Sequence, residues 1–284
     1  MEPNTANGAF SSCSTVVKVL VVVLGALLTV VVLALSHQHY TELRLDRVPL
    51  RRVSEFKGTQ QQSAKQCTHY EELIQAVVAG QNPPQLSRQQ LHWIATQIWS
   101  AGQGKGVPAN FLVFGLGLDS ITWRQINCLG RTVFLENWQS WIDKITGIDP
   151  LLEVYKVDYN TTVGTADAWF NGGRWPVALP ANVTSSSWDV ILVDAPQGYA
   201  GDMPGRMQSA QLALNLAQRC LEQGKLQRVV IFLHDMNRPL EQRIGREVFG
   251  ADPNLYYLGL MRGPLGNLAA WEYSKDVREA IAPE

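Results

Sequence analysis

Residues 111–120 read FLVFGLGLDS, and this stretch decides the fold. Its apolar half shows no polar alternation, which is typical of a strand covered on both faces, and glycines follow it at once. Further apolar runs come later in the chain, at 132–135, 152–157, 189–193 and 228–233. Helix-like stretches lie between several of them, notably 206–221. Strands that alternate with helices predict an α/β fold with a doubly wound, mostly parallel sheet.

Segments on both sides of this region complete the predicted domain. Residues 69–80 have helical spacing. Ser87 with Gln90 three positions later forms a capping box for a second helix that ends near Gly102. Near the C-terminus, LYYLGLMR and LAAWEY flank a Gly-Pro turn at 263–266. This pattern predicts an antiparallel pair of strands that closes the sheet.

Composition excludes some classes of protein. The chain has 24 basic and 25 acidic residues and a formal charge of -1, which argues against a nucleic-acid binder. Hydrophobic residues make up 46% and charged residues 17%, so a sizeable core is expected rather than disorder. One apolar run, VLVVVLGALLTVVVLAL at 19–35, is just long enough to cross a bilayer. It exceeds the usual core of a cleaved signal peptide, which favours a transmembrane anchor.

The anchor divides the chain into parts. We expect a short tail at 1–18, the anchor at 19–35, a stem rich in Gln, Arg and Ser at 36–66, and one globular domain at 67–284.

The orientation of the anchor is left open by the residues themselves. Arginines follow the anchor at 44, 47, 51 and 52, whereas only Lys18 precedes it closely, and this asymmetry favours a cytosolic domain. Two glycosylation sequons, at Asn160 and Asn182, have meaning only in a lumenal domain. The three cysteines after the anchor, at 67, 128 and 220, allow one disulfide at most.

Polar residues follow each predicted strand, at the edge where ligands bind in open parallel sheets. Each residue alone has an ordinary structural explanation, such as a turn, a cap or a surface charge. Their succession at consecutive strand ends favours a ligand site. The residues are Gly115, Gly117 and Asp119 after the first strand, Glu136 after the second, Asp158 after the third, Asp194 after the fourth, and His234 and Asp235 after the fifth.

The glycine pattern indicates which class of nucleoside-containing ligand is bound. A dinucleotide site requires GxGxxG, but Ser120 stands at the third glycine position, so no pyrophosphate cradle is evident. Carboxylates would repel a pyrophosphate and suit the positive sulfonium of S-adenosylmethionine. We expect Gly115, Gly117 and Asp119 to approach this donor, Glu136 to bind its ribose hydroxyls and Asp158 to reach its base.

Several strings also resemble a known family. FLVFGLGLDS, TVFLEN, WDVILVDAPQGY, PGRM and VVIFLHDMNR are similar to segments of the plant DUF579 polysaccharide-biosynthesis proteins, which include glucuronoxylan 4-O-methyltransferases. The resemblance runs from about Cys67 to Tyr273. It implies a single-pass Golgi membrane protein with a lumenal Rossmann-like class I methyltransferase domain and Golgi glycosyltransferases as partners. The implied reaction moves a methyl group from S-adenosylmethionine to O-4 of glucuronic acid in a cell-wall polysaccharide.

Roles for individual residues follow from this reaction. Asp194 is the first choice for a general base, followed by His234 and Asp235. Arg206 and Arg238 are candidates for the uronate carboxylate, which a guanidinium binds through two oxygens, and Tyr199 for stacking on a sugar ring. An alternative is that oxygen ligands at adjacent strand ends hold a divalent cation that acidifies the hydroxyl. These ligands would be Asp194, Asp235 and Asn237.

The chain departs from the family pattern at two places. Leu118 stands where familiar members have His, and Ala109 and Asn110 stand where they have Cys, which implies that Cys67 is unpaired. A competing function is a catalytically silent protein that organises polysaccharide synthesis in the Golgi. A third, a nucleotide-sugar or dinucleotide oxidoreductase, is disfavoured by the missing third glycine.

Overall fold

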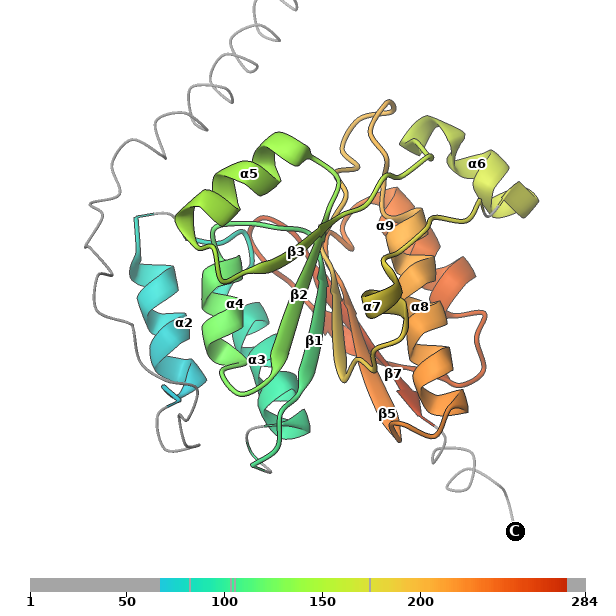
Figure 1. Cartoon of the computed structure of the whole chain (residues 1–284). Helices are drawn as coiled ribbons and strands as arrows, with labels where there is room; N and C mark the ends of the chain where they lie inside the picture. The colour runs from blue at the N-terminus through green and yellow to red at the C-terminus, as the bar shows by residue number, and fades with distance from the viewer. Residues whose placement is uncertain (1–66, 82, 103, 105, 174, 275–284) are drawn as a thin grey trace, which may run out of the picture. The chain divides into compact units, whose positions relative to one another are not determined.

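The computed structural model describes residues 67–81, 83–102, 104, 106–173 and 175–274 (Figure 1). The predicted tail, anchor and stem lie outside the described residues, so these predictions remain untested. Within the described ranges, no helix combines the length and apolar character needed to span a membrane.

Seven strands form one mixed sheet in the order β3-β2-β1-β4-β5-β7-β6. Strands β1 to β5 pair in parallel, while β7 is antiparallel to both β5 and β6. The predicted parallel sheet with an antiparallel C-terminal pair is therefore confirmed. The strands are β1 Asn110–Phe114, β2 Arg131–Glu136, β3 Glu153–Lys156, β4 Val190–Val193, β5 Arg228–Leu233, β6 Leu255–Met261 and β7 Leu268–Ser274.

Helices cover both faces of the sheet (Figure 1). On one side lie α2 Tyr70–Ala79, α3 Arg88–Ala101, α4 Ser120–Ile126 and α5 Gln139–Ile148. On the other lie α7 Ala181–Thr184, α8 Met207–Glu222, α9 Pro239–Ile244 and the π-helix η5 Gly245–Phe249. Short turns connect β3 to α7, namely η3 Val163–Thr165, α6 Ala166–Ala168 and the π-helix η4 Trp169–Gly173.

Strand β1 shows why the apolar run lacks alternation. Leu112 and Phe114 pack into the core beneath α8, whereas Phe111 and Val113 pack into the core beneath α3 and α4. Successive side chains of a strand point to opposite faces, and both faces are covered here. All four side chains are nearly inaccessible to solvent.

The predicted capping box at the start of α3 is confirmed. Gln90 N donates to Ser87 Oγ (3.3 Å), and Ser87 N donates to Gln90 Oε1 (2.8 Å). These reciprocal bonds satisfy two of the free backbone N–H groups at the helix N-terminus.

The expectation that Cys67 is unpaired is wrong. Cys67 forms a disulfide with Cys128, and their Cα atoms are 5.8 Å apart. Cys67 lies just before α2 and Cys128 just after α4, and these two helices pack against each other. The bridge therefore needs no cysteine before β1, and Cys220 is the free, buried cysteine of the described part.

The strand order reverses between β1 and β4, and this places the candidate site. In open α/β sheets the carboxyl ends of the strands at such a switch point line the ligand crevice. Gly115 at the end of β1 lies next to Ala195 after β4, since a Cβ on Gly115 would come within 3.2 Å of the Ala195 Cβ.

Candidate functional site

The turn after β1 presents backbone rather than side chains. Gly115 has φ +127°, a conformation that favours glycine. Gly117 N donates to Ser120 Oγ (2.9 Å), and a Cβ on Gly117 would lie 2.4 Å from Asp119 Oδ1. Helix α4 begins after Asp119, but the Asp119 carboxylate accepts from Trp123 Nε1 (3.2 Å) and does not cap the helix. The close packing of this turn thus requires glycine at both positions.

Glu136 is a buried carboxylate at the end of β2. Its Oε1 accepts from the backbone N–H groups of Asn137 (2.8 Å) and Trp138 (3.0 Å). Burial raises the pKa of Glu136, although these hydrogen bonds oppose the shift. Trp138 beside it is 58% exposed. This arrangement suits the predicted role in binding ribose hydroxyls.

The end of β3 differs from the sequence-based expectation. The Asp158 side chain is 79% exposed and forms an ion pair with Lys156 (2.6 Å). The neighbouring Tyr159 has a buried hydroxyl without a hydrogen-bond partner among the described residues. Burial and the charge of Glu136 both raise the pKa of Tyr159, so its hydroxyl stays protonated. Tyr159 is a candidate donor-binding residue that the sequence reasoning missed.

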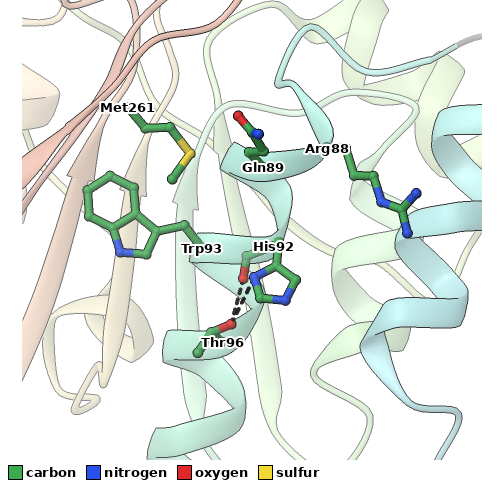
Figure 2. A pocket seen from close by; sticks show the side chains of 6 residues that line it. All are labelled: Arg88, Gln89, His92, Trp93, Thr96 and Met261. Carbon is green, nitrogen blue, oxygen red and sulfur yellow. Dashed lines mark hydrogen bonds between the residues drawn. The ribbon is translucent and has the colours of Figure 1, made fainter.

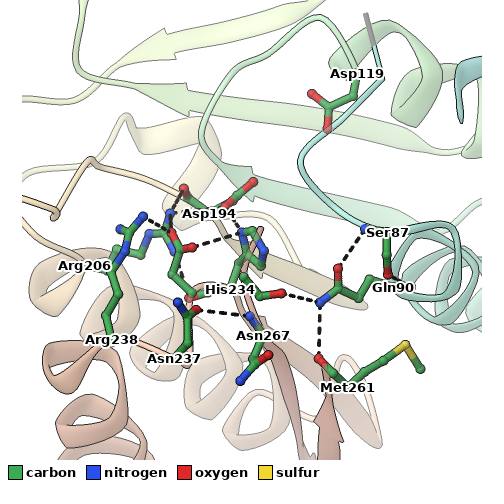
Figure 3. A network of polar contacts seen from close by, with 12 residues as sticks. Ser87, Gln90, Asp119, Asp194, Arg206, His234, Asn237, Arg238, Met261 and Asn267 are labelled. Atoms are coloured by element: carbon green, nitrogen blue, oxygen red, sulfur yellow. Dashed lines mark hydrogen bonds and ion pairs between the residues drawn. The ribbon is translucent and has the colours of Figure 1, made fainter. Parts of the chain in front are cut away.

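Around the ends of β4 and β5, side chains form a buried ionic network (Figure 3). Asp194 Oδ1 lies 2.8 Å from His234 Nδ1 and 3.2 Å from a guanidinium nitrogen of Arg206. The same guanidinium donates to the backbone oxygens of Asp194 (2.5 Å) and His234 (2.8 Å). The structure therefore brings together the predicted general bases and Arg206.

Asp235 extends this network to a second arginine. Its Oδ2 lies 2.7 Å from Arg206 and 3.0 Å from Arg238. Asp235 has φ +63°, an unusual conformation for a residue with a side chain, and backbone strain of this kind concentrates at functional sites.

Electrostatics tie Asp194 and His234 into a charged pair. Burial would raise the pKa of Asp194, but the charge and hydrogen bond of His234 and the charge of Arg206 bring it below its usual range. Burial would lower the pKa of His234, but the Asp194 carboxylate raises it overall. Asp194 is thus held as a carboxylate.

Accessibility separates the predicted bases. The Asp194 side chain is 29% exposed, whereas those of His234 and Asp235 are 0% and 2% exposed. Only Asp194 of the three can meet a ligand without rearrangement, which supports its place as the first choice. His234 Nε2 and Asp235 Oδ1 have no hydrogen-bond partner in the described part of the chain.

Asp119, after β1, interacts electrostatically with Asp194, after β4. Burial and the charge of Asp194 raise its pKa to about 6. The carboxyl groups after β1 and β4 therefore lie close enough to influence each other, as the strand order requires.

The predicted acceptor residues lie in different environments. Arg206 is 4% exposed, and its guanidinium points into the network instead of toward solvent. Arg238 is 27% exposed and Tyr199 is 62% exposed. Asn237 Oδ1 accepts from the backbone N–H of Asn267 (3.2 Å). Arg238 is therefore the more accessible of the two predicted arginines.

Glu241 on α9 is a further acid that the sequence did not reveal. It is completely buried, and neither carboxylate oxygen has a hydrogen-bond partner among the described residues. Burial raises its pKa, while the nearby Arg206 lowers it. In the sequence it looks like an ordinary acidic residue in the first turn of a helix.

A surface groove lies elsewhere, on α3 and the end of β6 (Figure 2). Its lining residues are Arg88, Gln89, His92, Trp93, Thr96 and Met261. None of the residues predicted for the site lines it. The buried carboxylates, the histidine and the arginines described above cluster at the carboxyl ends of the strands, so we place the candidate site there.

The fold and this site define a class of protein: a Rossmann-like α/β domain with a candidate ligand site at its switch point and a buried acid–histidine–arginine network beside it. The family follows from comparison. The family model described as IRX15/IRX15L/GXM matches residues 97–174 and 177–257, more than half of the chain, and the chain belongs to this family.

Curated relatives come from Arabidopsis thaliana. Glucuronoxylan 4-O-methyltransferase 1 is 38% identical over 160 residues, which cover 50% of this chain and 56% of that protein. Glucuronoxylan 4-O-methyltransferase 3 is 42% identical over 154 residues, 48% and 50% of the two chains. Arabinogalactan O-methyltransferase 1 is 34% identical over 163 residues, which cover 50% of this chain and 55% of that protein. The chain spans about half the length of the curated relatives it matches.

Among solved structures, a putative caffeoyl-CoA O-methyltransferase from Staphylococcus aureus matches with a TM-score of 0.40 and 12% identity, over 75% of this chain and 93% of that chain. This similarity is low, and the fold assignment rests on the strand order.

Proposed function

We propose that this protein is an S-adenosylmethionine-dependent O-methyltransferase that acts on O-4 of glucuronic acid in a glucuronoxylan-like cell-wall polysaccharide. The observation that carries the proposal is Asp194, a partly exposed carboxylate at the end of β4, beside the glycine turn of β1. Family membership and the names of similar relatives support the substrate class.

The residues at the ends of β1 to β3 fit the donor. At Gly115 and Gly117 a side chain would collide with neighbours, so the donor would meet the backbone of this turn. Glu136 would accept from two ribose hydroxyls. The Tyr159 hydroxyl has no hydrogen-bond partner among the described residues, and the charge of Glu136 raises its pKa, so it would serve as a further donor-binding group. Asp119 and Asp194 supply negative charge that suits a sulfonium.

The donor supplies an electrophilic methyl group. Asp194 would accept the proton of the attacking sugar hydroxyl, a role that requires its carboxylate to stay ionised and fixed. His234 and Arg206 satisfy both requirements through their contacts with Asp194 Oδ1. Alignment of the hydroxyl by the protein contributes further, because methyl transfer needs an in-line approach.

We assign binding of the uronate carboxylate to Arg238 and not to Arg206. Arg206 is occupied by the network, so we assign it the role of holding Asp194 and Asp235. Arg238 keeps 27% of its side chain exposed and would bind the uronate carboxylate. Tyr199 offers an exposed ring for stacking on a sugar.

The divalent cation is a separate part of the cofactor proposal. Ligand atoms of Asp194, His234 and Asp235 lie within 4.8 Å of one another. Asp235 Oδ2 already meets two guanidinium groups, and Asn237 Oδ1 accepts a backbone hydrogen bond. The positive charges of Arg206 and Arg238 beside these atoms oppose a resident cation, and no step of the proposed reaction uses one. Unchanged activity after chelation is the expected result, and restoration of lost activity by added Mn²⁺ or Co²⁺ would contradict it.

We also propose a Golgi membrane location with a lumenal domain. The Cys67–Cys128 disulfide supports an oxidising compartment, and the sequon residues Asn160 and Asn182 are exposed. Golgi glycosyltransferases would be the partners, because their products carry the uronic acid. Digestion of the natural protein with a glycosidase specific for N-glycans tests the orientation: a mass shift is expected, and a protein without glycans and with reduced cysteines would contradict it.

Methyl transfer itself is tested with the full-length protein, labelled S-adenosylmethionine and glucuronoxylan oligosaccharides. We expect label on O-4 of the glucuronic acid side chain. A matched control uses the same oligosaccharides with each uronic acid reduced to glucose, which removes the carboxylate alone and should abolish transfer at low acceptor concentration. Absence of transfer by a protein that binds the donor would favour the silent organiser, which no feature of the site favours at present.

A further inference from the structure

The Gln90 side chain links α3 to the opposite end of the domain sequence (Figure 3). Gln90 is completely buried, and its Nε2 donates to the backbone oxygens of Met261 (3.2 Å) and Gly266 (2.8 Å). Its Oε1 accepts from Ser87 N (2.8 Å) within the capping box. Both polar atoms of this amide are therefore engaged, and two of the three bonds hold the end of β6 and the turn that follows it.

The β6–β7 turn, residues 262–267, packs directly on this amide. A Cβ on Gly263 would lie 2.5 Å from Gln90 Oε1, so glycine is required for the contact. The other end of the turn is fixed to the segment after β5: Met236 N donates to Asn267 O (2.9 Å), and Asn267 N donates to Asn237 Oδ1 (3.2 Å). The turn thus bridges α3 and the segment that carries the ionic network.

Gly266 in this turn covers the back of the network. A Cβ at Gly266 would lie 2.7 Å from His234 Nε2 and 2.7 Å from Asp235 Oδ1. Both atoms are buried and lack a hydrogen-bond partner in the described residues. Gly266 therefore packs against the second imidazole nitrogen, at a place where any side chain would overlap it.

We infer that Gln90 is a positioning residue for the site: it holds the 262–267 turn so that Gly266 seals His234 Nε2. Nδ1, bonded to Asp194, is then the imidazole nitrogen that makes a hydrogen bond. This inference deepens the proposed function and rests on it where turnover is concerned. The seal itself does not depend on the identity of the substrate.

The direction of the Gln90 amide matters more than its burial. Gln90 is buried on α3 one helical turn before the core residue Ile94, so an apolar side chain of equal size could fill its place. An apolar residue could not fix the carbonyl groups of Met261 and Gly266. Loss of the amide should free the turn while the core stays filled.

The test compares Gln90→Met, which keeps the side-chain volume, with Gln89→Met, the same change at an exposed neighbouring position. Hydrogen–deuterium exchange at the imidazole C2 of each histidine, read by mass spectrometry in the full-length protein, measures access to the ring. In the wild type and in Gln89→Met, His234 should exchange far more slowly than the exposed His92. In Gln90→Met, His234 exchange should rise toward that of His92.

Turnover provides the second readout. In Gln90→Met we expect kcat to fall roughly ten- to hundredfold with KM for the donor unchanged, since a displacement of about 1 Å at a reacting group has this effect. Gly266→Ala should reproduce both results, because its methyl group overlaps His234 Nε2. Slow His234 exchange and wild-type kcat in both variants would overturn the inference. A wild type that lacks donor binding but shows the predicted exchange pattern would instead overturn the proposed function alone.

Discussion

The carboxyl edge of the sheet has two halves, which hold their polar side chains in different ways. At β1 and β2, polar groups are held by backbone: Ser120 closes the glycine turn, and Asn137 and Trp138 fix the Glu136 carboxylate. At β4 and β5, charged side chains hold one another, with Asp194 and His234 at the centre. We assign the first arrangement to donor binding and the second to the reactive group. Mutations in the two halves should therefore change binding and turnover separately.

Asp194→Asn gives the largest expected effect. The amide keeps the size of the side chain but cannot accept a proton, so kcat should fall about 10²- to 10⁴-fold, the usual range for loss of a general base. Donor affinity should change little. Asp202→Asn, on the exposed part of the same loop, is the matched control and should retain activity. Equal loss of donor affinity and turnover in Asp194→Asn would break the proposed division between the halves.

The Cys67–Cys128 disulfide lies away from both halves, so its removal should change stability and leave turnover unchanged. Cys128 precedes β2, at the amino edge of the sheet, and the bridge to Cys67 spans 61 positions. Replacement of both cysteines by Ala should lower the free energy of unfolding by about 2–4 kcal/mol. Denaturant titration measures this change, and kcat at low temperature serves as the comparison. A large fall in kcat for the folded variant would show that the bridge acts on the site.

Tyr159→Phe tests whether the Tyr159 hydroxyl, in the half formed by the ends of β1 to β3, contributes to donor binding. Removal of the unpartnered hydroxyl should weaken donor binding by about 1 kcal/mol, roughly fivefold in Kd, if the ligand supplies its missing partner. Tyr155→Phe is the control, since that hydroxyl donates to Glu153. Identical donor Kd values for the wild type and Tyr159→Phe would remove Tyr159 from the site.

Asp119→Asn gives the smallest expected effect and tests the coupling between the halves. Because the folded-state pKa of Asp119 is raised to about 6 from 3.8, its stabilising contribution is complete below pH 3.8 and is lost as pH rises through 6. At pH 7 the variant should be more stable than the wild type by about 1 kcal/mol, allowing for solvent screening of a half-buried group. At pH 4 most of this difference should vanish. Parallel stability curves from pH 4 to 7 would contradict the shift.

The sequence predicted what depends on local pattern. The β5 run ends at Leu233 as expected, and the capping box at Ser87 is present. Periodicity and cap chemistry act over a few residues, so they can be read directly from the chain. The same reasoning placed Asp194 and His234 at neighbouring strand ends, because parallel strands share one carboxyl edge.

What the sequence could not predict depends on contacts between distant segments. Arg206 was expected to face an acceptor, but its guanidinium fills a gap between Asp194 and Asp235 that exists only in the folded domain. Gln90 was recognised as a cap, yet its amide nitrogen reaches 176 positions along the chain to Gly266. Asp158 follows a strand as a ligand residue should, but the chain turns so that its side chain lies in solvent.

Calorimetric titration of the full-length protein with S-adenosylmethionine, S-adenosylhomocysteine and NAD tests the central claim most directly. The account predicts that both adenosyl compounds bind, that NAD does not, and that Glu136→Ala loses this binding while the folded Asp158→Ala keeps it. A folded wild type that binds neither adenosyl compound, or that binds NAD instead, would contradict the assignment of the donor site.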